Sequence, residues 1–185
     1  MTYFSKYPTY QYDLQDTQTR KLVTDIVRRV QMKANVKANT QVFDNYTVKE
    51  GEQPDIVADK YYGDSTLHWI IVLVNNITSR YDWPLDQVAL SEFVADKYSN
   101  VNGTHHHEIN ATSGDTTKKL IVSSDTTGAT AVTNFEHEQT VNDNKRKIRL
   151  LDRLYVRQFI SEFEKLIAIK SCSSCYLKYQ QLSIF

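Results

Sequence analysis

The chain has 185 residues, of which 41% are hydrophobic and 11% aromatic, and this composition is typical of a folded protein rather than a disordered one. Its 22 basic and 22 acidic residues cancel, which argues against non-specific binding to nucleic acid because such binding needs a cationic surplus. The longest apolar run, Trp69 to Val74, is far shorter than the roughly 20 residues that span a bilayer. The N-terminal segment lacks an apolar signal core. We therefore expect a soluble, unexported protein that binds neither membrane nor nucleic acid.

The glycines and cysteines argue against several kinds of chemistry. No glycines are spaced as in G-x-G-x-x-G, G-x-x-x-x-G-K or G-x-S-x-G, so dinucleotide, P-loop and nucleophile-elbow sites are not indicated. Cys172 and Cys175 form a single C-x-x-C, whereas a structural zinc site needs four ligands. We therefore predict no cofactor.

Residues 1–17 are predicted to be an extended arm, because their aromatic side chains lie among polar ones and cannot form a core alone. An apolar stripe at helical spacing follows and predicts a helix that ends near Lys33. The stripe consists of Leu22, Val23, Ile26, Val27 and Val30. The polar stretch Asn35–Thr40 predicts a linker, so helix and linker together occupy residues 18–43.

Residues 44–86 predict a strand, a helix, a short turn and a second helix. The strand contains Tyr46 and Val48. Pro54 is favoured as the first residue of a helix, and Gly63 can adopt the left-handed conformation that ends one. The core of this module is expected to comprise Tyr46, Val48, Gly51, Pro54, Ile56, Val57, Tyr62, Gly63, Leu67, Trp69, Ile70, Ile71, Val74 and Asn75.

Residues 87–170 are predicted to form a small α+β region. Ser91 could cap a helix that runs to about Tyr98 and turns Phe93 and Val94 inward. Short strands are expected at Thr104–Ala111, Lys118–Ser123 and Lys147–Leu151, with an exposed loop over residues 124–144.

The last predicted helix has the clearest amphipathic pattern. Asp152 caps it, and it runs to about Lys170. Its apolar stripe consists of Val156, Phe159, Ile160, Phe163, Leu166 and Ile167. The tail that follows, residues 171–185, shows no clear periodicity.

The order of signals in residues 44–86 resembles a LysM module. The resemblance rests on the Y-x-V-x-x-G opening at Tyr46, the apolar helix after Pro54, the Y-G turn at Tyr62–Gly63 and the second helix that ends at Asn75. LysM modules are small βααβ units that bind N-acetylglucosamine chains of peptidoglycan or chitin. Where their second strand should follow, this chain reads Tyr81–Leu85, YDWPL, which is typical of a turn. The resemblance therefore predicts a βαα core without its second strand.

A longer series of motifs resembles the LysM-containing baseplate wedge subunit of contractile-tailed bacteriophages. In chain order the motifs are T-D-I and R-R-V (24–30), Y-T-V-K-E-G-E-Q-P (46–54), Y-Y-G-D-S-T-L-H-W-I-I (61–71), N-N-I (75–77), W-P-L (83–85), K-Y (97–98), H-H-H-E (105–108), N-D-N-K-R-K-I-R-L-L-D (142–152) and E-F-E-K-L-I (162–167). The resemblance implies a structural protein of the virion tail, made in the host cytoplasm. Such a protein packs against other wedge subunits and helps to join neighbouring wedges into a ring around the tail hub.

A run of histidines followed by Glu108 raises the question of a metal site. Successive side chains of a strand point to opposite faces, so His105 and His107 are expected on one face and His106 on the other. Two histidines are too few for zinc without a third ligand. The remaining candidates, all distant in the sequence, are Glu136, His137 and Glu138. We therefore predict packing in a strand or an interface rather than a metal site.

No pair of residues indicates catalysis. His68 has no nucleophile or carboxylate at a telling spacing, so we expect a half-buried structural residue. The acidic residues show no local pairing typical of a glycoside hydrolase. The basic run Lys145–Lys147 is interpreted as a solvated strand edge, with contact to an acidic partner as the alternative. We predict that the protein is not an enzyme.

Aromatic residues outside the apolar stripes are candidates for contacts with other proteins, because Tyr and Trp are enriched at interfaces. We predict two contact surfaces, the N-terminal arm and the turn at residues 78–86, and we expect the arm to become ordered on assembly. The candidate residues are Tyr3, Phe4, Tyr7, Tyr10, Tyr12, Tyr81, Trp83, Pro84 and Leu85.

The sequence thus predicts an α+β protein with a LysM-like βαα core, flanking helices and a small antiparallel sheet. Its predicted function is structural, within a phage tail baseplate. The alternative is a peptidoglycan-binding LysM module of a cell-wall-associated or lytic protein. Sugar binding is not favoured, because a second LysM strand and an export signal are not indicated.

Overall fold

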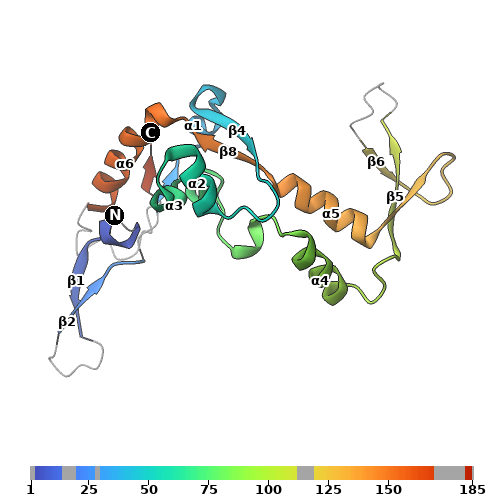
Figure 1. The fold of residues 1–185 in the computed structure, drawn as a ribbon, viewed down its shortest axis with the longest axis horizontal. Coiled ribbons are helices and arrows are strands. Elements are labelled where there is room, and N and C mark those ends of the chain that lie inside the picture. The colour runs from blue at the N-terminus through green and yellow to red at the C-terminus, as the bar shows by residue number, and fades with distance from the viewer. Residues whose placement is uncertain (1–2, 14–19, 28–29, 112–118, 169–181, 185) are drawn as a thin grey trace. The chain divides into compact units, whose positions relative to one another are not determined.

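The computed structural model describes residues 3–13, 20–27, 30–111, 119–168 and 182–184 (Figure 1). It is a mixed α+β protein, as predicted. The chain divides into two compact units. The first combines Met1–Tyr46, Glu52–Thr78 and Ile148–Phe185, and the second combines Thr47–Gly51 with Ser79–Lys147. The second unit is therefore formed mainly by one long segment inserted between two parts of the first.

The first unit begins with a short 3-10 helix, η1 (Tyr3–Lys6), and a β-hairpin. Strands β1 (Thr9–Tyr12) and β2 (Lys21–Thr24) pair in antiparallel orientation. The prediction of a helix that ends near Lys33 is wrong for the described residues, because strand β2 lies in this segment. Its apolar spacing does not mark a buried helical face, because Leu22 lies on strand β2 and is 70% exposed.

Strand β3 (Val30–Met32) and helix α1 (Ala34–Ala38) follow. Because α1 occupies part of Asn35–Thr40, the prediction that this stretch is a linker is wrong there. The two outer residues of β3 are buried and the middle one is half-buried, which is the alternation of a strand. Strand β3 pairs in parallel with β9 (Leu182–Ile184). Local sequence could not predict a partner so distant in the chain.

The predicted order of strand, helix, turn and helix is confirmed. Strand β4 (Phe43–Thr47) precedes α2 (Pro54–Tyr62), and a 3-10 turn, η3 (Ser65–Leu67), leads into α3 (His68–Val74). Pro54 is the first residue of α2, and Gly63 ends it with a φ of +77°. Both signals are local, which is why the sequence sufficed to place these helices.

The strand that pairs with β4 comes from a distant part of the chain. It is β8 (Lys147–Leu151), and the two form a two-stranded sheet. Asn75, directly after α3, connects that helix to β8. Its side-chain amide donates to the Arg149 carbonyl at 2.8 Å, and its side-chain oxygen accepts from the Arg149 backbone N–H at 2.9 Å. Strand β4 therefore has a partner that follows the second unit in sequence, and this partner is the strand predicted at Lys147–Leu151.

Helix α6 (Arg153–Ala168) contributes an apolar face to the core of the first unit. Its predicted stripe is confirmed: Phe159 and Phe163 are fully buried, and the ring of Trp69 on α3 lies 4.5 Å from that of Phe163, centroid to centroid. The Asp152 carboxylate accepts a hydrogen bond from the Leu154 backbone N–H at 2.9 Å, as expected of a cap. The other buried hydrophobic residues of this core cluster are Tyr7, Val30, Met32, Phe43, Ile70, Val74, Leu151, Val156 and Ile167.

The second unit combines a three-stranded antiparallel sheet with two helices. The sheet has the order β6-β5-β7, in which β5 (Thr104–Asn110) lies between β6 (Lys119–Val122) and β7 (Thr130–Thr133). The predicted strands at 104–111 and 118–123 are thereby confirmed in their described parts. The helices are α4 (Gln87–Lys97) and α5 (Asn134–Lys145).

Helix α4 begins earlier than predicted. Asp86, not Ser91, caps it, because the Asp86 carboxylate accepts from the Ala89 backbone N–H at 2.7 Å. Ser91 lies inside the helix and donates to the Val88 carbonyl. Of the two side chains expected to face inward, Val94 is buried, whereas Phe93 is 37% exposed.

Helix α5 and strand β7 occupy much of the predicted loop over residues 124–144, so that prediction is wrong. The helix has no apolar stripe, and its two buried residues are Glu138 and Asn142. A capping box of Thr133 and Glu136 begins it. That T-x-x-E signal was visible in the sequence and could have identified the helix.

Candidate functional site

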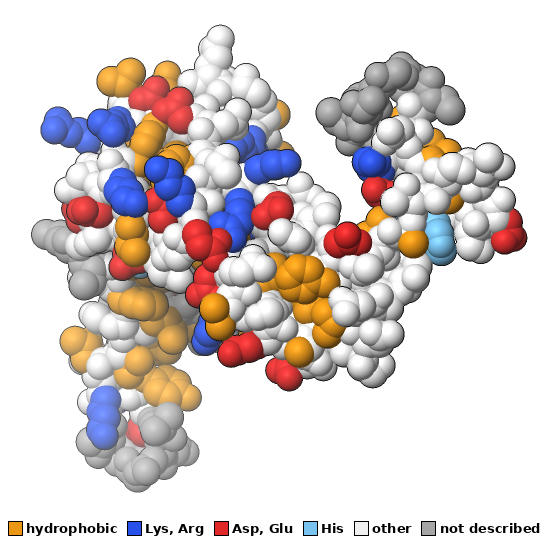
Figure 2. Space-filling model, turned by 45° about the vertical axis from the view of Figure 1, so that its right-hand side comes forward, with side chains coloured by type: hydrophobic (Ala, Val, Ile, Leu, Met, Phe, Trp, Pro, Cys, Tyr) orange, Lys and Arg blue, Asp and Glu red, His pale blue; other side chains and the backbone are white. Residues whose placement is uncertain are grey.

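The β1–β2 hairpin carries most of the exposed hydrophobic side chains at the N-terminal end of the first unit. The hairpin extends beyond the helices of this unit (Figure 1), and hydrophobic side chains are exposed along it (Figure 2). Tyr10 and Tyr12 contact each other edge to face, with centroids 6.1 Å apart. The hairpin surface, as we define it, comprises Tyr10 (42% exposed), Tyr12 (46%), Leu22 (70%), Val23 (40%), Ile26 (65%) and Val27 (64%).

Two other aromatic residues of the predicted arm pack inside the first unit. Tyr7 is 8% exposed, and its ring lies 6.4 Å from Phe163 on α6. Tyr3 contacts Trp69 at 5.5 Å, and its hydroxyl shares a hydrogen bond of 2.5 Å with that of Tyr7. Burial and this hydrogen bond raise the pKa of Tyr7. The expectation that the whole arm is ordered only on assembly is therefore wrong for these two residues, whereas Phe4 remains 60% exposed.

The predicted contact turn in the second unit is only partly exposed. It contains a 3-10 helix, η4 (Arg80–Asp82), with a capping box between Ser79 and Asp82. Tyr81 is 67% exposed, but Trp83 is 6% exposed. Trp83 is therefore a core residue of this unit and not a free contact, which corrects its interpretation as an interface residue. Pro84 and Leu85 are half-buried.

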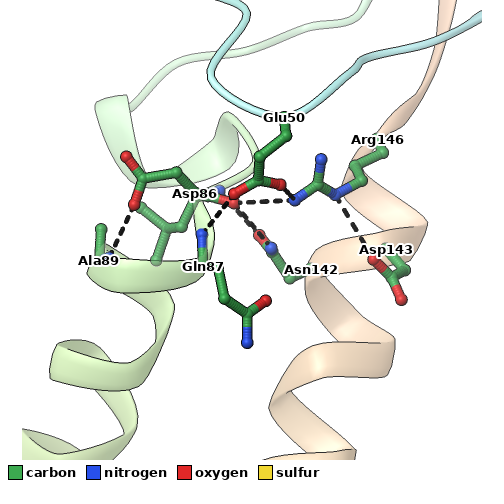
Figure 3. Close-up of polar contacts among 8 residues, drawn as sticks. Glu50, Asp86, Gln87, Ala89, Asn142, Asp143 and Arg146 are labelled. Atoms are coloured by element: carbon green, nitrogen blue, oxygen red, sulfur yellow. Dashed lines mark hydrogen bonds and ion pairs between the residues drawn. The ribbon is translucent and has the colours of Figure 1, made fainter.

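A polar clamp holds the end of this turn in place (Figure 3). The Asn142 side chain accepts from the Leu85 backbone N–H at 2.8 Å and donates to the Leu85 carbonyl at 2.9 Å. Glu50 accepts from the Gln87 backbone N–H and from the Arg146 guanidinium, each at 2.5 Å. The hydrogen bond from Arg146 lowers the pKa of Glu50 below its ordinary value. The clamp, defined as Glu50, Leu85, Gln87, Asn142 and Arg146, connects residues 47–51, the start of α4 and the end of α5.

A second polar group connects α4 and α5. The buried Glu138 carboxylate accepts from Lys97 Nζ at 2.7 Å and from the Tyr98 hydroxyl at 2.8 Å. Burial alone would raise the pKa of Glu138, but these hydrogen bonds outweigh it and lower the pKa overall. Glu138, a candidate metal ligand on sequence grounds, thus has two hydrogen-bond partners within the unit.

The histidines lie differently from the predicted alternation. A β-bulge between β5 and β7 falls at His105, so His105 and His106 both approach His137 on α5. His107 is not part of this group. The expectation that His105 shares a face with His107 and not with His106 is therefore wrong.

Six of the fourteen residues expected in the module core are buried. Val48, Val57, Trp69, Ile70, Ile71 and Val74 are each at most 5% exposed. Tyr62 is half-buried and donates to the Leu151 carbonyl at 3.1 Å. Three of the fourteen are not core residues, because Ile56 is 40% exposed and Gly51 and Gly63 are exposed at turns. The expectation that His68 is half-buried is also wrong, because His68 is exposed. Leu67 is half-buried at the start of α3.

Comparison with known families identifies the protein's class. A family model described as base plate wedge protein 53 matches residues 10–127. The chain belongs to this family. The match starts in β1 and extends past β6, so it includes the hairpin surface, the β4–α2–α3 segment and the turn before α4. No curated protein matches the chain.

Membership of the base plate wedge protein 53 family makes the chain a structural protein of the phage tail baseplate, located in the virion. The predicted resemblance to a baseplate wedge subunit is confirmed to that extent. A structural role is consistent with a protein that is not an enzyme. None of the described helices has the length and apolar character needed to cross a membrane.

Proposed function

We propose that this baseplate wedge protein joins neighbouring wedge subunits through two surfaces, the hairpin surface of the first unit and the Tyr81 turn of the second. The observation that carries the proposal is the hairpin surface itself. Leu22, Ile26 and Val27 are each at least 64% exposed although they are aliphatic. Fully burying such a side chain contributes about 1.5–3 kcal/mol, so a partner that covered all three would gain several kcal/mol toward the cost of association.

The chemistry of the hairpin surface favours an apolar patch on another wedge subunit as its partner. Two tyrosines lie beside the aliphatic side chains, and aromatic residues are common at the centres of protein interfaces. Their rings already contact each other, so little side-chain freedom is lost on binding. The family gives the context, because a wedge protein must contact other baseplate components.

The first unit then serves as the scaffold, and we propose that it is LysM-like. The pairing of β4 with β8 supports this, because a β4–α2–α3–β8 arrangement has the βααβ order of a LysM module. In this protein the second unit is inserted between α3 and β8. Sugar binding is not part of the proposal, since Trp69 and Trp83 are both buried and present no open face for stacking on a sugar ring.

The direct test is incorporation of hairpin variants into baseplates. The variant L22S/I26S should fold normally and be incorporated at least tenfold less than the wild type into wedges assembled from the other subunits. A matched control is L154S, because Leu154 is 83% exposed on α6 of the same unit but lies outside the family match. Normal incorporation of L22S/I26S, or an equal loss in the control, would overturn the proposal.

The sugar-binding alternative has its own test. Isothermal titration with peptidoglycan fragments and chitin oligomers should show no saturable binding in the micromolar range. Saturable binding that is lost on substitution of exposed residues of the first unit would favour the LysM glycan interpretation instead. Incorporation and glycan titration are independent, so one result does not decide the other.

A further inference from the structure

Three imidazoles from two elements of the second unit come together at one end of the sheet. His105 and His106 lie on β5, and His137 lies in the first turn of α5. One ring nitrogen from each lies within 4.8 Å of the others. His105 Nδ1 and His106 Nδ1 are 2.8 Å apart. In tetrahedral zinc sites the Zn–N distance of about 2.0–2.1 Å places ligand nitrogens roughly 3.3 Å apart, a spacing that lies within the span of this group.

The fold creates this group through the β-bulge. In regular pairing His105 and His106 would point to opposite faces of the sheet. The bulge inserts His105 between Thr104, paired with Thr133, and His106, paired with Val132, and so re-aims one of the two side chains. Bulges that redirect a side chain are common next to functional sites.

A carboxylate lies beside the three imidazoles. One oxygen of Glu108 lies 4.0 Å from His106 Nε2, and the other lies 3.4 Å from Lys119 Nζ. Metal-binding histidines commonly donate their second ring N–H to such a carboxylate, which fixes the orientation of the ring.

We propose that His105, His106 and His137 bind one divalent transition-metal ion of the zinc class, with water in the fourth position. Imidazole is a preferred ligand of Zn²⁺, and three histidines with an open position form an established type of zinc site. The ion would connect β5 to α5 and add a cross-link to a unit with a small apolar core. None of the three residues is needed for the proposed hairpin contacts, so this proposal stands apart from the proposed function.

The metal-free geometry predicts which side chain must move. The rings of His105 and His137 are stacked, with centroids 3.8 Å apart and planes 8° from parallel. Nitrogen lone pairs lie in the ring plane, so two stacked rings cannot both direct them at one ion. His105 is exposed, whereas His106 and His137 are half-buried. Metal binding therefore turns the His105 ring out of the stack.

The test is titration of the full chain with Zn²⁺ after removal of metal by a chelator. Cys172 and Cys175 could bind zinc themselves, so all measurements use the C172S/C175S background. Calorimetry should show one ion bound per chain with micromolar or tighter affinity, and the melting temperature of the second unit should rise. Titration with Co²⁺ gives a second readout, since its visible absorption reports nitrogen ligands and coordination number.

Two variants decide whether these histidines are the ligands. H106Q and H137Q should each weaken Zn²⁺ binding at least tenfold, whereas H107Q, on the same strand but outside the group, should bind as the background does. Circular dichroism checks that each variant is folded. A second pair repeats the comparison at exposed positions, with H105Q as the ligand variant and H68Q as the control. No saturable binding in the micromolar range, or equal binding by H106Q, H137Q and H107Q, would overturn the proposal.

Discussion

The two units of the protein are stabilised in different ways. In the described chain, all but four of the buried hydrophobic residues belong to the first unit, where α3, α6 and η1 pack aromatic rings together. The four in the second unit are Val48, Trp83, Leu90 and Val94. With so few buried hydrophobic residues, that unit also buries two polar side chains, Glu138 and Asn142, and satisfies both with hydrogen bonds. The much larger apolar core of the first unit is accompanied, among the described residues, by one buried polar side chain, Glu52. We infer that packing stabilises the first unit and that specific polar contacts stabilise the second.

The largest effect is expected in the packed core of the first unit. Replacing Phe163 by alanine should lower the free energy of unfolding by about 3–5 kcal/mol, because the side chain is fully buried and in contact with Trp69. Urea denaturation measures this. Leu154→Ala on the same helix is the control and should change stability by less than about 0.5 kcal/mol, since Leu154 is exposed. An unchanged midpoint for Phe163→Ala would show that this helix is not part of a core.

A medium effect is expected at Glu138. Glu138→Gln removes the charge from two hydrogen bonds and should destabilise the second unit by about 1.5–3 kcal/mol. Hydrogen exchange of the α4 and α5 amides measures this unit separately from the first. Glu92→Gln, an exposed acid on α4, is the matched control and should leave exchange unchanged. Equal exchange in both variants would contradict polar stabilisation.

The same residue predicts a dependence on pH. The pKa of Glu138 is lower in the folded protein than the ordinary value of 4.5, so the folded state binds its proton less readily than the unfolded state. Its contribution is therefore present above that ordinary value and is lost as pH falls through the lower, folded pKa. The second unit of the wild type should lose stability over this acid range more steeply than Glu138→Gln does. Parallel pH curves for the two proteins would contradict this.

A smaller effect is expected in the polar clamp. Arg146→Ala removes hydrogen bonds to Glu50 and Leu85 and should destabilise the second unit by about 1–2 kcal/mol. The change should appear as faster exchange at the start of α4, near Gln87, before it appears in the sheet. Arg80→Ala, in η4 of the same unit, serves as the control. Unchanged exchange at Gln87 in Arg146→Ala would show that the clamp does not position the turn.

The helices of the first unit could be predicted because their signals are local. Pro54, Gly63 and Asn75 each act within one turn of a helix end, and the stripe of α6 has a single clear period. The pairing of β4 with β8 could not be predicted in this way, since the second unit separates the two strands in sequence. Elements with local signals could therefore be predicted from the sequence, whereas a pairing between strands distant in the chain could not.

Three other predictions failed for different physical reasons. The apolar residues from Leu22 to Val30 are spaced as in a helix, but part of this segment is strand β2, which pairs with β1. Most side chains of β2 are exposed, so the apolar spacing does not indicate a buried face there. Helix α5 was missed because it buries polar side chains. The grouping of His105 with His106 was missed because strand alternation holds only without a bulge.

The smallest effect on stability, and the largest on assembly, is expected at the hairpin surface. The most direct measurement is hydrogen exchange of the amides in β1 and β2, compared between the free protein and the assembled baseplate wedge. We predict that assembly slows exchange in Thr9–Tyr12 and Lys21–Thr24, while exchange in α6, already protected by its core, stays the same. Equal exchange of the hairpin in the free and assembled protein would contradict its role as an assembly contact.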